Sequence, residues 1–428
     1  MRPSVAALSR PVSHRITAAL PRRTYQTMIM RPPVAALSRP VSRLAAAVPR
    51  RAYQTRKEHI RFYDQELRIG GSDRIDASVA RPASASRVRA TLPLSTDAPL
   101  AREYERQGGG MRLGRVLEDL DALAGEVAYR HANLELPAPG ADHAYRLVTA
   151  RVERLAIDAA AWRSLTSRTD VRYDGRATSV GTSSMRVALD VAVGADRRPL
   201  LASNFLMVSR DAATDAPRPL PPLAGGAAPP AREAAADPRA PPTAEASAKL
   251  HGIHLRREAA KAGAGDVVDM RATKLRTFEI GHPDARNVHG KVFGGYLLRE
   301  CYEVAHTTAT RFAGGRCLVP AVVEDFQFVA PVDVGTVVAL LAKVVHSTAT
   351  SVQVTVEATA LDMDRSLKRT SGNEREEVTD RMHVVFVLDG APLPHVVAPQ
   401  SYAEGLLWLA GAARYDRAVR AGDVPPES

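Results

Sequence analysis

The sequence predicts an α+β protein that contains two copies of one unit, each an antiparallel sheet wrapped around a central helix. Three observations lead to this prediction. Two halves of the chain resemble each other, each half begins with apolar residues at helical spacing, and each continues with apolar residues at every second position. Because the strands follow one another without intervening helices, an antiparallel sheet is favoured in both copies.

The internal repeat is seen in three pairs of segments that occur in the same order in both halves. They are 117–132 with 298–313, 147–153 (LVTARVE) with 318–324 (LVPAVVE), and 182–193 with 349–360. A shared order of similar segments indicates a duplicated domain.

The first element of each half is an amphipathic helix. Its buried face consists of Leu113, Val116, Leu117, Leu120, Leu123, Ala124, Val127 and Ala128 in the first half, and of Leu297, Cys301, Val304, Ala305, Ala309 and Phe312 in the second. Spacings of three and four residues are typical of a helix that buries one side.

Later in each half the period changes to two. The alternating apolar residues are Met185, Val187, Leu189, Val191 and Val193 in the first half, and Val352, Val354, Val356, Ala358 and Ala360 in the second. This alternation is typical of strands with one buried face.

The basic character of the chain comes from its first 57 residues. These contain twelve Lys and Arg and no acid, whereas the other 371 residues carry 46 basic and 47 acidic side chains. The stretch is itself repeated, 1–27 against 30–55, and each copy ends in Arg-Arg-x-Tyr-Gln. Arginine-rich segments without acids are typical of mitochondrial presequences, so we predict a matrix-targeting segment that is cleaved after Tyr53, with a basic tail as the alternative.

Proline marks the division between the two halves. Residues 212–243 carry nine of the thirty prolines and few large apolar residues, which indicates a linker. The predicted parts are a presequence (1–57), a lead-in (58–86), a first domain (87–211), a linker (212–270), a second domain (271–395) and a C-terminal tail (396–428).

Several classes of protein are disfavoured by composition. Outside the first 57 residues no basic cluster with interleaved aromatics occurs, so we expect no nucleic-acid partner. The sequence contains no run of about 18 apolar residues, so no membrane span is predicted. The two cysteines, Cys301 and Cys317, provide neither a disulfide framework nor a metal-ligand spacing, so we expect no metal and no cofactor.

The second half resembles the hotdog-fold acyl-coenzyme A thioesterases. The similarity lies in NVHGKVFGG (287–295), FVAPVDVG (328–335) and ATSVQV (349–354), and the first half resembles a more diverged hotdog domain through RLGRVLEDLDALAG (112–125). The resemblance implies a double hotdog, with two domains paired through their sheets, helices on the outer face and thioester entry between the domains. It also implies an acyl-CoA substrate and association of double-hotdog units into a homo-oligomer.

Members of this family use an Asp on the helix of one domain and an Asn before the Gly-Gly turn of the other. The Asp position holds Asp121 in the first half and Tyr302 in the second; the Asn position holds Asn287 in the second half, whereas Gln107–Gly110 stands in the first. The resemblance therefore implies one catalytic pair, Asp121 and Asn287, and a twin that has lost both members.

These residue types suit thioester hydrolysis. A carboxylate activates water or attacks the thioester directly, an amide orients water or the carbonyl, and backbone N–H groups at a helix N-terminus stabilise an oxyanion. We assign the last role to Gly294 and Gly295. His289 is a weaker candidate base, and Cys301 lies on the apolar face of its helix, where a thiol belongs to the core.

Two other functions remain open from the sequence. A binding or regulatory protein keeps the paired domains without turnover, and the divergence of the first half favours it. A hotdog enoyl-CoA hydratase is the second, although the Asp-His spacing of such enzymes is absent here.

Overall fold

The computed structural model describes residues 61–62, 75–107, 109–134, 144–226, 241–263, 266–361 and 378–426. The predicted presequence lies outside the described residues, as do part of the lead-in and residues 362–377.

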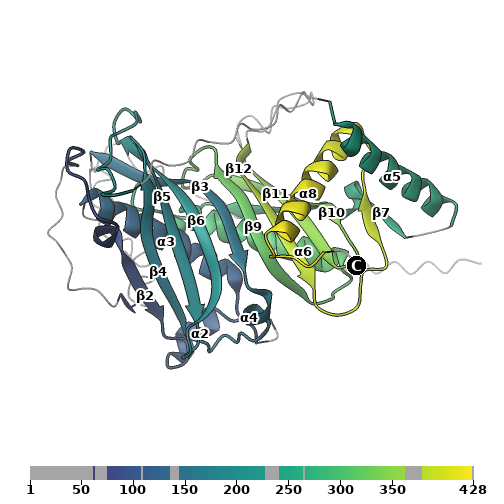
Figure 1. The fold of residues 1–428 in the computed structure, drawn as a ribbon, viewed down its shortest axis with the longest axis horizontal. Helices are drawn as coiled ribbons and strands as arrows, with labels where there is room; N and C mark the ends of the chain where they lie inside the picture. Colours follow the sequence, from purple (N-terminus) through teal and green to yellow (C-terminus); the bar gives the residue numbers. More distant parts are fainter. Residues whose placement is uncertain are drawn as a thin grey trace, which may run out of the picture. The chain divides into compact units, whose positions relative to one another are not determined.

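The two halves form one continuous antiparallel sheet of eleven strands, in the order β1-β2-β4-β5-β6-β3-β9-β12-β11-β10-β8 (Figure 1). The first half supplies β2 (Val88–Leu92), β3 (Tyr145–Ile157), β4 (Val171–Val180), β5 (Ser184–Val193) and β6 (Arg198–Asp211), with β1 (Arg61–Phe62) at the edge. The second half supplies β8 (Leu275–Ile280), β9 (Leu318–Phe328), β10 (Val337–Ser347), β11 (Ser351–Leu361) and β12 (Val378–Leu388). The predicted pairing through the sheets is thus confirmed, at β3 and β9.

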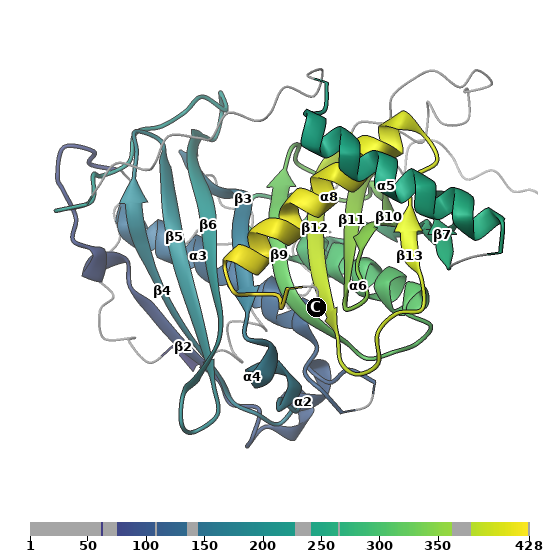
Figure 2. The same ribbon diagram turned by 45° about the vertical axis from the view of Figure 1, so that its right-hand side comes forward.

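Each half wraps its sheet around one long helix, α3 (Leu113–Ala132) or α6 (Gly294–Phe312). The predicted apolar stripes are buried against the sheet and merge into one core. The two helices also contact each other, and an ion pair joins Glu118 of α3 to Arg299 of α6 at 3.3 Å. The expectation of helices on an outer face was wrong: α3 and α6 lie side by side on one face, enclosed by the curved sheet (Figure 2).

A different helix covers the opposite face. α8 (Tyr402–Arg420) packs Tyr415 and Ala418 on Val322 and Val385 of the sheet. Beside it lie α5 (Ala244–Lys261) and a parallel pair of strands, β7 (Val267–Asp269) and β13 (Val396–Ala398). The predicted C-terminal tail (396–428) therefore includes α8, which covers valines on the outer face of the sheet. Without α8 these valines would face water.

The remaining helices are short. They are α2 (Ala98–Glu103), α4 (Ala159–Arg163) and the 3₁₀ turns η4 (Ala83–Ser86), η5 (Met270–Thr273) and η6 (Pro283–Ala285).

The junction between the halves creates an opening in the sheet. β3 pairs with β9 only between Arg151 and Ala156, whereas its pairing with β6 extends back to Tyr145. The first residues of β3 therefore have a sheet neighbour on one side only, and a cavity lies at this unpaired edge.

Candidate active site

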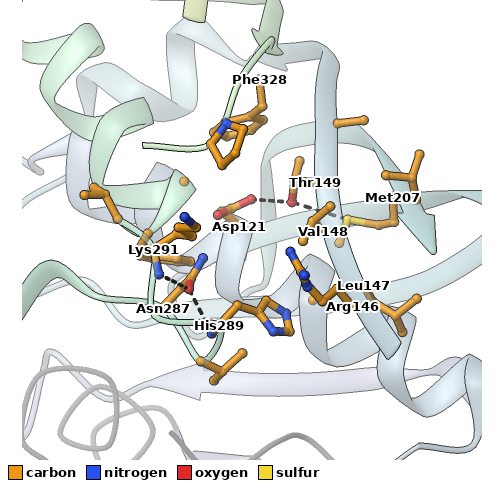
Figure 3. A pocket seen from close by; sticks show the side chains of 18 of the residues that line it. Asp121, Arg146, Leu147, Val148, Thr149, Met207, Asn287, His289, Lys291 and Phe328 are labelled. Carbon is orange, nitrogen blue, oxygen red and sulfur yellow. Dashed lines mark hydrogen bonds between the residues drawn. The ribbon is translucent and has the colours of Figure 1, made fainter. Parts of the chain in front are cut away.

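The cavity has a volume of about 310 Å³ and is lined by both halves of the chain (Figure 3). Its walls come from α3, the start of β3, the end of β6, the turn before α6 and the end of β9. The residues used below are Asp121, Gly125, Tyr129, Arg146, Thr149, Met207, Arg210, Asp215, Asn287, His289, Lys291, Gly294, Leu297 and Phe328. Asp121, from one motif of the first half, and Asn287 and Gly294, from one motif of the second half, thus lie on one cavity.

Asp121 is held as a buried carboxylate on α3. Its side chain is 6% exposed, and the Thr149 hydroxyl donates a hydrogen bond to Oδ1 at 2.6 Å. Burial raises the pKa of Asp121 to about 6; the Thr149 hydroxyl and the Gly295 N–H lower the pKa, and the charge of Glu118 raises it. A carboxyl with this pKa is ionised at pH 7 and accepts a proton more readily than an exposed aspartate does.

The N-terminus of α6 points at this carboxylate. Phe293, which precedes the helix, makes no side-chain capping hydrogen bond, in contrast to the Ser401 hydroxyl that accepts from Glu404 N–H in α8. Instead the Gly295 N–H is hydrogen-bonded to Asp121 on the other helix. The partial positive charge of the helix end favours the ionised form of this carboxyl.

Gly294 and Gly295 are needed because the start of α6 lies very close to neighbouring atoms. A Cβ on Gly294 would lie 2.7 Å from the Phe328 ring and 3.2 Å from Asp121 Oδ2, and a Cβ on Gly295 would lie 2.9 Å from the Glu118 carbonyl oxygen. The absence of side chains therefore allows α6 to begin directly against α3. Because the Gly295 N–H already donates to Asp121, Gly294 is the better placed of the two for an oxyanion.

The orientation of the Asn287 amide is determined by its own turn. The backbone N–H groups of His289 and Lys291 both donate to Asn287 Oδ1, at 2.9 and 3.1 Å. Two donors require the oxygen on that side, so the amide nitrogen points into the cavity, as Figure 3 shows. Asn287 consequently offers a hydrogen-bond donor to a bound molecule.

The second copy of the site, formed by the turn at Arg106 and by Tyr302, has the same backbone arrangement as the site at Asn287 and Asp121, but side chains fill it. The turn that holds Asn287 N–H on the Lys291 carbonyl (2.7 Å) recurs with Arg106 N–H on the Gly110 carbonyl (2.9 Å). The structure therefore places Arg106 at the Asn position, one residue before the predicted Gln107–Gly110 stretch.

At the twin's Asp position the ring of Tyr302 is buried. It packs against His306 and Phe386, with ring centroids 6.2 and 6.1 Å apart. His306 is the counterpart of Gly125, which lines the cavity in the first half. The twin has thus lost its carboxylate and its amide, and aromatic rings occupy the space beside them.

The weaker candidates take different places. His289 lines the cavity with its Nε2 3.3 Å from the Tyr129 hydroxyl, whereas Cys301 is fully buried in the core and burial raises its pKa, which keeps the thiol protonated. Among the described residues no group of His, Cys, Asp or Glu has the arrangement of a metal site. No helix in the same ranges is long and apolar enough to span a membrane.

Thr149 and Met207 were not predicted. Thr149 binds Asp121 through its hydroxyl, which also lies 3.4 Å from Met207 Sδ. A signal for Thr149 was present in the repeat, because LVTARVE has threonine where LVPAVVE has Pro320. Only the half that supplies the carboxylate carries a hydroxyl at this position.

Comparisons with known proteins find thioesterases. The family model of the thioesterase superfamily matches residues 289–366. The chain is 28% identical to human mitochondrial acyl-coenzyme A thioesterase 9 over 356 residues and 27% identical to the bovine protein of that name over 354, and each match covers 77% of both chains. A chloroplastic acyl-coenzyme A thioesterase 2 of Humulus lupulus is 28% identical over 293 residues, 62% of this chain and 64% of its own.

Solved structures are also similar. A putative oleoyl thioesterase from Lactobacillus plantarum matches 73% of this chain and 98% of its own, at 11% identity and a TM-score of 0.45. An acyl-CoA hydrolase from Staphylococcus aureus, solved with butyryl coenzyme A, matches 36% of this chain and 90% of its own, at 22% identity and a TM-score of 0.32. The chain is thus similar over most of its length to mitochondrial acyl-coenzyme A thioesterases, and its two halves share one antiparallel sheet.

Proposed function

We propose that this protein hydrolyses acyl-CoA to a free carboxylic acid and coenzyme A at the cavity between its halves. The observation that carries the assignment of the site is the convergence of one buried carboxylate, one oriented amide donor and the N-terminus of α6 on that cavity. The names of the relatives support acyl-CoA as the substrate class.

In the proposed reaction Asp121 acts as general base. It takes a proton from water while the water oxygen bonds to the thioester carbon, and the carbonyl electrons move onto the oxygen. The intermediate then collapses, the carbon–sulfur bond breaks, and coenzyme A leaves with the electron pair on sulfur. In the alternative reaction Asp121 attacks the thioester carbon directly and coenzyme A leaves as the thiolate. Water then hydrolyses the resulting anhydride, and the same donors contact the carbonyl oxygen. A single turnover in H₂¹⁸O tests for direct attack: ¹⁸O in the protein identifies an anhydride that water opens at the Asp121 carbonyl, whereas a general base leaves the label in the product only.

Charge on the carbonyl oxygen is stabilised by two donors. The amide nitrogen of Asn287 points into the cavity, and Gly294 presents a first-turn N–H of α6, which has no partner within the helix. Donors of this kind act most strongly on charge that develops in the transition state.

We further propose the mitochondrial matrix as the location and a homo-oligomer of double-hotdog units as the assembly. The mitochondrial names of the mammalian relatives and the arginine-rich first 57 residues support the location. We also propose the division of the chain into a presequence, two domains and a linker, with the boundaries given above.

The test is a thiol-release assay with short, medium and long acyl-CoAs. Release of free thiol from at least one of them supports the hydrolase. Binding of acyl-CoA without release by the purified full chain would identify a regulatory protein instead, and a product with an intact thioester would identify a hydratase.

The pH dependence of hydrolysis should follow Asp121. Because the pKa of this group is raised to about 6 and only the ionised form accepts a proton, kcat/KM falls about tenfold per pH unit below 6 and reaches a plateau above about 7. 4,4′-Dithiodipyridine detects the released thiol across this range. His289→Gln should show the same fall in kcat/KM below pH 6. If that fall disappears in the variant, the group that titrates is His289 and not Asp121.

A further inference from the structure

Two arginines that line the cavity lie directly opposite each other on neighbouring strands. Arg146 of β3 and Arg210 of β6 are partners in the strand register, so their side chains leave the same face of the sheet, and both line the cavity. Like charges directly opposite on neighbouring strands destabilise a sheet. A bound anion between the two guanidinium groups would remove that cost.

The charges of these arginines are only partly balanced within the described residues. Arg146 donates to the carbonyl oxygen of Ala212, and no described carboxylate forms an ion pair with it. Arg210 donates to the Asp215 carbonyl at 3.0 Å, and its Nη1 lies 3.5 Å from Asp215 Oδ2; the side chains of Arg210 and Asp215 are 42% and 64% exposed. Lys291, the other basic side chain on the cavity besides His289, is paired with Asp333.

The separation between the arginine pair and the catalytic carboxylate suits a long substrate such as a coenzyme A thioester, whose phosphates lie far from its thioester. Thr149, which binds the catalytic carboxylate, and Arg146 lie three residues apart on β3, about 10 Å along the strand and on opposite faces. The cavity touches both, because β9 does not pair with this part of β3. A molecule with its thioester at Asp121 would pass this strand edge and place its far end at the arginines; Figure 3 shows Asp121, Thr149 and Arg146 beside the cavity.

We propose that Arg146 and Arg210 bind the phosphate groups of coenzyme A. The inference rests on the proposed function and adds a recognition site for the anionic end of the substrate. Guanidinium groups bind phosphate oxygens through paired, charge-assisted hydrogen bonds, and two facing groups hold a diphosphate from both sides. The Asp215 carboxylate competes with the phosphate for Arg210.

The test compares an acyl-CoA with the acyl-N-acetylcysteamine thioester of the same acid, which has no phosphate. Arg146→Gln and Arg210→Gln should each raise KM for the acyl-CoA about tenfold or more and leave KM for the truncated thioester within about twofold. Arg176→Gln is the matched control, because Arg176 pairs with Asp190 elsewhere in the same sheet. Equal losses on both thioesters, or no loss on either, overturn the proposal.

Asp215→Asn supplies a change of opposite sign. Asp215 has a φ of 57°, a conformation that asparagine also adopts, so the turn is preserved while the competing charge is removed. The KM for acyl-CoA should fall in this variant; an increase or no change contradicts phosphate binding at Arg210.

Titration of free coenzyme A into the full-length protein separates this inference from the assigned reaction. If the wild type hydrolyses neither thioester but binds coenzyme A, and both arginine variants weaken that binding about tenfold, the phosphate site stands and the proposed hydrolysis fails. If the arginine variants bind coenzyme A as the wild type does, the site fails whatever the turnover.

Discussion

Replacement of Asp121 by asparagine is expected to lower kcat about 10²- to 10⁴-fold, the usual contribution of a positioned general base. The substitution keeps the shape of the side chain but removes the group that accepts the proton. KM should change little, because the donors that hold the carbonyl come from Asn287 and Gly294. Thiol release at saturating acyl-CoA measures the loss.

The same variant is expected to be more stable than the wild type above pH 6. Burial raises the pKa of Asp121 from 3.8 to about 6, so the folded state resists ionisation and loses about 3 kcal/mol once the carboxyl is charged. This cost is absent well below pH 4, where the group is protonated in both folded and unfolded states, and is complete above 6. Urea unfolding at pH 7.5 should show the gain.

Asp119 provides the matched control, because it is a second buried aspartate on α3. The hydroxyls of Tyr104 and Tyr173 donate to its Oδ2 at 2.7 and 3.0 Å. Asp119→Asn should therefore reduce stability and retain kcat. If Asp121→Asn keeps wild-type kcat, or if both substitutions lower kcat equally, Asp121 is not the base.

Loss of the Asn287 amide should be the second largest effect. Asn287→Ala is expected to lower kcat about 10²- to 10³-fold, as removal of one oxyanion donor does in other hydrolases. Because that donor acts on charge that develops in the transition state, KM is expected to change less than kcat.

Asn287→Asp separates the donor from the turn. A carboxylate oxygen still accepts from the N–H groups of His289 and Lys291, so the turn survives, but no donor faces the cavity. Activity should fall at least as far as in the alanine variant. An aspartate variant with near wild-type kcat would reduce Asn287 to a residue that only shapes the turn.

Local patterns explain why much of the fold was predictable from the sequence. The spacing of three and four residues predicted α3 and α6, the alternation in β5 and β11 predicted strands, and the repeat predicted two similar units. The role of α8 was not predictable in this way. The apolar face of α8 covers the outer valines of the second half. The apolar run Val384–Leu388 at the end of β12 indicates burial on both faces of the sheet, but it does not identify the element that covers the outer face.

The residue types of the site were also predictable, but their environment was not. Asp121 and Asn287 were implied by the resemblance to the hotdog thioesterases, and Gly294 was assigned because its backbone N–H lies at the start of a predicted helix. The roles of Thr149, of the Gly295 N–H and of the facing arginines depend on which strands and helices become neighbours.

The sequence by itself determined the two units, their helices and strands, and the single acid and amide that the halves do not share. Only the tertiary structure decided that these two groups face one cavity, that burial against α6 makes the acid a stronger base, and that Tyr302, His306 and Phe386 fill the twin. The physical reason is that periodicity and repeats act over a few residues, whereas a pKa and a cavity depend on atoms that only folding brings together.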